Sequence, residues 1–180
     1  PMPPMPSEAV LTGSFDYRLV ALSVLISMLA SYAALDLTGR VSASQGQRRF
    51  TWLTGGAAAM GIGIWAMHYI GMLAYSLPVA VLYDWPTVLW SLLAAVLASA
   101  VALFVVGRKQ MGLLSIGSGG LLMGSGIAAM HYIGMEAMRL PAMCHYSLGL
   151  VFLSIVLAVA ISLVALWLTF HLRAETKSMG

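Results

Sequence analysis

Two histidines, each followed four residues later by a methionine, are the residues of this chain best suited to chemistry. They are His68 with Met72 and His131 with Met135, and each pair lies in a long apolar segment. A spacing of four residues places both side chains on one helix face, about one turn apart. Imidazole and thioether together suit copper, particularly Cu(I), whereas a set without carboxylates is poor for Mg, Ca or Mn. The pattern therefore predicts a copper site, and zinc is less suitable because it seldom uses thioether ligands.

The two pairs belong to a duplicated segment. Residues 60–78 match residues 123–141 at a constant offset of 63, and 14 of the 19 positions are identical. Helix packing asks only for apolar residues of suitable size, so it does not explain why His and Met recur in register. Ionisable groups within membrane spans are functional candidates by default. The repeat strengthens that interpretation for His68 and His131.

Residues beside the histidines are candidates for further ligands or for a supporting role, and each also has an ordinary structural explanation. Met67 and Met130 precede the histidines on another helix face, where Met is commonly core filler. Tyr69 and Tyr132 suit the membrane interface, and they suit equally a position that orients a ligand. Met138 extends the second methionine stripe by one position.

Cys144 and His145 lie in the loop that follows the second set. A sulfur and nitrogen pair there could be an entry ligand or part of the site, and an ordinary loop is the alternative. Cys144 is the only cysteine of the chain, so it cannot form an intrachain disulfide.

The composition places these residues in a membrane. The chain is 61% hydrophobic and 8% charged, against about 25% charged residues in soluble domains, and its mean hydropathy is +0.92. Its apolar runs reach the roughly 20 residues that a helix needs to cross a bilayer. We therefore expect an all-α fold, a polytopic transmembrane helical bundle with spans at about 17–38, 50–76, 86–106, 112–138 and 148–171. Residues 15–175 would form one membrane domain, between a disordered outer tail (1–14) and a cytoplasmic tail (176–180).

The basic residues predict the orientation. Seven of the nine fall after the first, third and fifth spans, and that side is expected to be cytoplasmic. The N-terminus would then be outside and the C-terminus inside, in the cytoplasmic (inner) membrane of a bacterium. Both His-Met sets would lie near the outer face. The lipid bilayer is the expected partner, and because topology accounts for the net charge of +3, we expect no nucleic-acid binding.

Each copy of the repeat contains two spans, so the copies run parallel and their histidines reach the same depth. Gly-rich faces are expected to bring the second and fourth spans together, and the GxxxG spacing of Gly120 and Gly124 is weak evidence for a helix contact. Asp84, followed by Trp-Pro, predicts a helix start. Asp36 and Arg40 have the spacing of an ion pair on one helix.

Met67-His68-Tyr69 and Met130-His131-Tyr132, each followed by Ile-Gly-Met, resemble the motifs of the MHYT family of bacterial integral membrane sensor domains. Residues 17–23 and 31–36 are similar to that family as well, and the resemblance covers residues 14–175. It implies that copper binds near the outer face through the Met, His and Tyr of the motifs. It also implies sensing of a diatomic gas (O2, CO or NO), and signalling to a cytoplasmic output domain such as a diguanylate cyclase or phosphodiesterase.

The chain departs from this pattern in two ways. Ile70 and Ile133 stand where the family name implies Thr. The family carries three motifs and this chain has two, so we expect it to be truncated before a third motif and to lack the output domain. It shows no nucleophile–base set and no phosphate-binding loop, and we do not expect it to be an enzyme itself. A homodimer is left open.

Two other classes of protein stay open. Two histidines on neighbouring spans could be the axial ligands of a haem, although Ile70 and Met72 crowd His68. A copper carrier or permease would need polar or metal-binding residues along a path through the membrane, and the inner halves of these spans are almost wholly apolar. A visible spectrum and a metal analysis would separate these readings.

Overall fold

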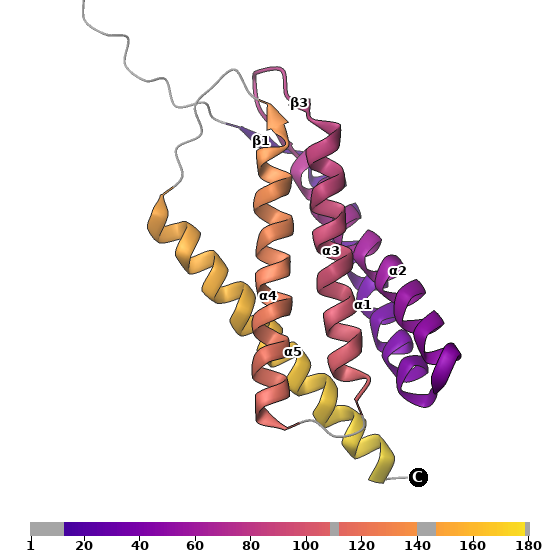
Figure 1. The fold of residues 1–180 in the computed structure, drawn as a ribbon. Helices are drawn as coiled ribbons and strands as arrows, with labels where there is room; N and C mark the ends of the chain where they lie inside the picture. The colour runs from indigo at the N-terminus through magenta and orange to yellow at the C-terminus, as the bar shows by residue number, and fades with distance from the viewer. Residues whose placement is uncertain (1–12, 109–111, 140–146, 179–180) are drawn as a thin grey trace, which may run out of the picture.

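Five long helices form the protein. The computed structural model describes residues 13–108, 112–139 and 147–178, with side chains described as far as His171. The helices are α1 (Tyr17–Ala43), α2 (Gly46–Leu73), α3 (Trp85–Val106), α4 (Leu113–Glu136) and α5 (Leu148–Ser178), as Figure 1 shows. All five are long and apolar enough to cross a membrane. The predicted all-α, polytopic membrane fold is therefore confirmed.

Several helix ends differ from the predicted spans, and α5 continues to Ser178, seven residues past the predicted end at 171. α1 continues to Ala43 and α2 already begins at Gly46, because polar residues at a membrane surface extend a helix without extending its apolar run. Between them the chain reverses at Gly46, whose φ of 55° is a conformation that glycine adopts at little cost. α4 ends at Glu136, two residues before the predicted end at 138, because the chain turns there into a short strand.

Aspartates begin α1 and α3. Asp16 accepts a hydrogen bond from the backbone N–H of Arg18 at 2.9 Å. Asp84 accepts bonds from the backbone N–H of Thr87, at 3.2 Å, and from its hydroxyl, which confirms the predicted helix start. These two bonds from Thr87 hold the pKa of Asp84 below its ordinary value, so the capping carboxylate stays ionised.

Two short antiparallel strand pairs close the helix pairs at one end. β1 (Ser14–Phe15) pairs with β2 (Tyr75–Ser76), and β3 (Leu82–Tyr83) pairs with β4 (Met138–Arg139). Beside them the N–H of Asp16 donates to the carbonyl of Ala74 at 2.8 Å, and that of Asp84 to Ala137 at 2.9 Å. The prediction that Met138 continues a helical stripe is therefore wrong, because Met138 lies in β4. Each helix pair, α1–α2 and α3–α4, is a closed hairpin.

Consecutive helices pack against each other, and α3 lies at the centre between α2 and α4 (Figure 1). A Cβ at Gly61 of α2 would come within 2.6 Å of the Val96 Cα of α3, and one at Gly124 of α4 within 2.5 Å of the Val159 Cα of α5. Glycine thus allows these close approaches. The expectation that Gly-rich faces join α2 directly to α4 is corrected, because α3 separates the two helices over most of their length.

The duplication includes whole hairpins. α2 and α4 correspond at the offset of 63, whereas α1 and α3 correspond at an offset of 68, as the capping residues Asp16 and Asp84 do. The contacts between helices follow these offsets. A Cβ at Gly63 would meet Ala30 Cβ at 3.0 Å, and one at the equivalent Gly126 would meet Ala98 Cβ at 2.7 Å. Equivalent residues of the two copies can therefore be compared one by one.

Candidate metal centre

The two repeated histidines meet near the end of the bundle that carries the strand pairs, where α2 and α4 end. The ring centroids of His68 and His131 are 4.9 Å apart and their planes are inclined by 68°. Elsewhere α2 and α4 make few contacts with each other. The structure therefore brings together the two residues that the sequence made the first candidates.

His68 has an unpaired nitrogen. Its Nε2 is buried and has no hydrogen-bond partner among the residues that the structure describes, an arrangement that costs about 1–3 kcal/mol for a buried polar group. Gly134 of α4 leaves the space for this atom, because a Cβ there would lie 3.1 Å from Nε2 and 3.7 Å from the Ser91 hydroxyl of α3. Imidazole nitrogen is a ligand that suits copper, as it does zinc, iron and nickel, so the two histidines are compatible with copper.

The methionines of the repeat follow the histidines along α2 and α4. Met72 and Met135 are partly buried, one helical turn beyond His68 and His131. Within residues 13–108, 112–139 and 147–178, no group of three or more His, Cys, Asp or Glu side chains gathers in one place.

The methionines that precede the histidines lie within the packed helices. Met130 is buried, with 3% of its surface exposed. The carbonyl of Met67 accepts a hydrogen bond from the Ser23 hydroxyl of α1 at 2.8 Å. Cys144 and His145, the candidates in the following loop, lie outside the described residues.

Aromatic side chains frame the α2 side of the pair. Tyr69 stacks on Trp65, with ring centroids 5.3 Å apart, and its ring lies 5.2 Å from that of Tyr83 in β3. Burial, and after it the neighbouring Tyr69, raises the pKa of Tyr83 above its ordinary value. Tyr83 is therefore a neutral phenol at physiological pH.

On the α4 side, Tyr132 connects the pair to α5. Its ring meets that of His131 edge-on at 5.0 Å. Its hydroxyl is 2.5 Å from the Ser154 hydroxyl of α5 and hydrogen-bonded to it. The end of α4 that carries His131 is thus linked to the next helix.

Four residues near the histidines were not predicted as part of the site: Tyr83, Ser91, Gly134 and Ser154. A signal for two of them was present, because Ser23, Ser91 and Ser154 occupy equivalent positions of α1, α3 and α5 at the offsets of 68 and 63. Each of these serines lies close to a motif residue or to Gly134. Comparing the first helices of the copies, and not only the motif helices, would have found them.

The contact between the histidines bears on the haem alternative. Axial imidazoles lie on opposite faces of a haem, with the macrocycle between them. Rings in edge-to-face contact at 4.9 Å leave no space for such a plane. A haem would require α2 and α4 to move apart at this end.

The architecture defines a class of protein: a multi-pass membrane domain built from two copies of one helical hairpin and a further helix, with paired imidazoles at one end. The family model described as MHYT, bacterial signalling protein N-terminal repeat, matches residues 61–119 and 124–180. The chain belongs to the MHYT family, and the resemblance seen in its motifs is confirmed.

Curated relatives carry signalling names. The chain is 48% identical over 93% of its length to the bifunctional diguanylate cyclase/cyclic di-GMP phosphodiesterase MucR of Pseudomonas aeruginosa, of which it covers 24%. It is 40% identical over 92% of its length to the cyclic di-GMP phosphodiesterase NbdA of the same organism, of which it covers 21%. The signaling protein YkoW of Bacillus subtilis is 35% identical, also over 92% of the chain, which covers 20% of YkoW. No solved structure matches.

The chain spans a quarter or less of the length of these relatives. It corresponds to their MHYT membrane domain, and the enzyme activities that two of them are named for are not assigned to it. The chain is therefore an MHYT sensory domain of bacterial signalling proteins, and two of its relatives act on cyclic di-GMP by name.

Proposed function

We propose that this domain binds copper between the ends of α2 and α4 and senses there a diatomic gas (O2, CO or NO) or a change of redox state. The observation that carries the proposal is the pair His68 and His131, 4.9 Å apart, with His68 Nε2 buried and unpaired. Thioethers complete a soft ligand set without carboxylates. The proposed ligands are His68, His131, Met72 and Met135, and the proposed supporting residues are Met67, Met130, Tyr69, Tyr132, Met138, Cys144 and His145.

Copper bound by imidazole and thioether supplies a redox-active centre with a weakly held position for a diatomic molecule. The protein's own part is to hold the two helix ends at the right separation and to transmit a change in it. Tyr132 does so for α4, since its ring contacts His131 and its hydroxyl bonds Ser154 of α5. Movement of that end of α4 is thereby passed to α5. A ligand shifts this equilibrium only by binding the two arrangements with different affinity.

The proposal includes a setting. The distribution of basic residues supports an outside N-terminus in a bacterial inner membrane, with the histidines near the outer face. The names of MucR and NbdA support a cytoplasmic output domain that makes or degrades cyclic di-GMP. A homodimer and a third motif stay predictions.

Metal analysis of the purified protein tests copper binding. Copper should be retained by the wild type. It should be lost when His68 and His131 are both replaced by Ala, because this change removes both imidazole rings. His171→Ala is the matched control, since His171 stacks on Trp167 of α5, with ring centroids 4.8 Å apart, far along the chain from the motifs. A folded double variant that keeps its copper would contradict the proposal.

Two further measurements separate the alternatives. Haem absorption in the visible spectrum would show that the protein binds haem and not copper. Copper uptake into liposomes that contain the protein would indicate a carrier rather than a sensor.

Sensing has a separate test. The chain, fused to a diguanylate cyclase reporter, is titrated with oxygen, carbon monoxide and nitric oxide, with and without His68 and His131. A response that depends on the histidines supports gas sensing. An identical output in both cases would make the metal structural, while leaving copper binding intact.

A further inference from the structure

A cleft lies at the opposite end of the bundle from the histidines. It has a volume of about 410 Å³ and opens between α3 and α4, with one side chain of α2 in its wall. Six of its lining residues determine its chemistry: Leu53, Val101, Leu122, Arg108, Ser115 and Ser118. We call this space the basic cleft.

The basic cleft is polar at its mouth and apolar in its depth. Arg108 follows the end of α3, and Ser115 stands in the first turns of α4. Leu122 lies seven residues, or about 10 Å, further along α4 toward the middle of the membrane. Val101, two turns back along α3 from Arg108, forms the opposite wall. This order matches a molecule with a polar head and an apolar tail.

The charge at the mouth is positive, and no carboxylate of the described residues pairs with it. The Arg108 guanidinium lies over the Phe104 ring, 4.9 Å from its centroid, and has no ion pair with any carboxylate among the described residues. Arg49 stands close by, since its Nη2 donates to the carbonyl of Gly107 at 3.2 Å. α4 also begins there without a side-chain cap, at Gly112, and its positive dipole end adds to the field.

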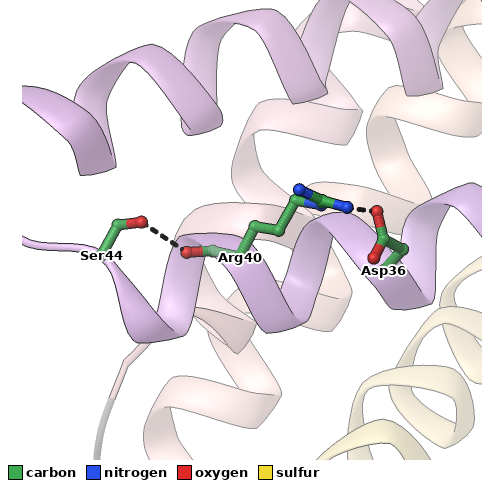
Figure 2. Close-up of polar contacts among 3 residues, drawn as sticks. All are labelled: Asp36, Arg40 and Ser44. Atoms are coloured by element: carbon green, nitrogen blue, oxygen red, sulfur yellow. Dashed lines mark hydrogen bonds and ion pairs between the residues drawn. The ribbon is translucent and has the colours of Figure 1, made fainter.

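In the first copy of the repeat, the equivalent arginine has partners within the protein. Arg40 is the equivalent of Arg108, and its Nε is bonded to Asp36 at 2.7 Å (Figure 2). Its guanidinium also lies 4.9 Å from the centroid of the Trp52 ring. The carboxylate neutralises this arginine and the indole covers it.

In the second copy both of these partners are replaced. Phe104 stands where the first copy has Asp36, and Ser115 stands where it has Trp52. The first change removes the counter-charge. The second removes the indole, so that the ring beside the guanidinium is that of Phe104. The result is a cation without a carboxylate partner in the part of the chain that the structure describes. It lies at the mouth of an open cleft, at a membrane boundary where the abundant anion is lipid phosphate.

We propose that the basic cleft binds an anionic phospholipid of the bilayer. Its phosphate lies against Arg108 and the Ser115 hydroxyl, which has no hydrogen-bond partner in the described part of the chain. One acyl chain lies along Val101 and Leu122, which line the cleft from α3 and α4. The proposal does not depend on copper.

Native mass spectrometry of the purified chain, given equal amounts of phosphatidylglycerol and phosphatidylethanolamine, tests this inference. The wild type should retain phosphatidylglycerol in preference. Arg108→Gln should lower that retention about fivefold, since one basic residue near an anionic membrane surface contributes about that factor. Ser115→Trp, which restores the indole of the first copy, should lower retention of both lipids by filling the cleft.

Arg40→Gln is the matched control, because it removes the same formal charge from an arginine that already has a partner. It should change phosphatidylglycerol retention by less than twofold. Equal losses in Arg108→Gln and Arg40→Gln would overturn the proposal, since the protein would then attract lipid by overall charge alone. Equal retention of both lipids by the wild type would overturn it too, because the cleft would not distinguish headgroups.

Discussion

Gly134→Ala tests the candidate metal centre at a single atom. A Cβ at this position would lie 3.1 Å from His68 Nε2 and 3.4 Å from its Cδ2. Carbon and neighbouring heavy atoms pack without repulsion at about 3.5 Å or more, so the ring must move by about 0.4 Å. Ligand positions in a metal site are set to within about 0.2 Å. We therefore expect a loss of copper affinity of about 10- to 100-fold, the range typical of changes just outside a ligand set.

The first copy supplies the control for this change. Gly71 is the equivalent of Gly134, and a Cβ there would meet the Ser23 hydroxyl at 3.6 Å, an ordinary contact. Gly71→Ala should therefore keep its copper affinity. Both variants should remain folded, because Ala is favoured over Gly in a helix by about 1 kcal/mol.

Copper affinity is measured by competition with a chromogenic Cu(I) chelator, and folding by thermal unfolding in detergent. Wild-type affinity in Gly134→Ala would show that His68 Nε2 does not face the metal. Equal losses in the Gly134 and Gly71 variants would show that a methyl group anywhere in these helices disturbs binding, and the local argument would fail.

Three further predictions concern stability and topology. Gly61→Leu should lower the unfolding free energy by about 1–3 kcal/mol through overpacking. Gly55→Leu should not, because nothing lies within 4 Å of a Cβ there. Thermal unfolding compares the two variants. Asp84 has a folded pKa below its ordinary 3.8, so its contribution to stability is complete above that value and is lost as the pH falls through the folded pKa. Asp84→Asn or Thr87→Val should reduce the loss of stability at low pH. Acid unfolding that is unchanged in these variants would refute the role of the Asp84 carboxylate. A membrane-impermeant thiol reagent should reach Cys144 in intact cells, and protection of Cys144 would invert the orientation.

The sequence was sufficient to predict the five spans, because their apolar runs reach bilayer length whatever packs against them. The capping role of Asp84 and the Asp36–Arg40 ion pair were also predicted, since both depend on residues one turn apart. The meeting of His68 and His131 followed from the parallel repeat, and the structure places them together.

Other features depend on contacts between distant segments. A two-residue strand has no periodicity to detect, so β4 was taken for the end of a helix and Met138 was misplaced. The central position of α3 depends on which glycine meets which neighbour, as Gly61 meets Val96, and composition does not show this. The unpaired state of Arg108 becomes visible only when its surroundings are compared with those of Arg40.

The strand pairs that close each hairpin have a consequence for the order of assembly. Contacts within a hairpin are close in sequence, so α1–α2 and α3–α4 can each form once their two helices are in the bilayer. His68 and His131 belong to different hairpins, and neither hairpin alone contains the pair. The pair therefore forms only when the two hairpins dock, with α2 against α3. Any ion held between the two rings would stabilise the docked hairpins over the separated ones by mass action, and would mark the domain as fully assembled.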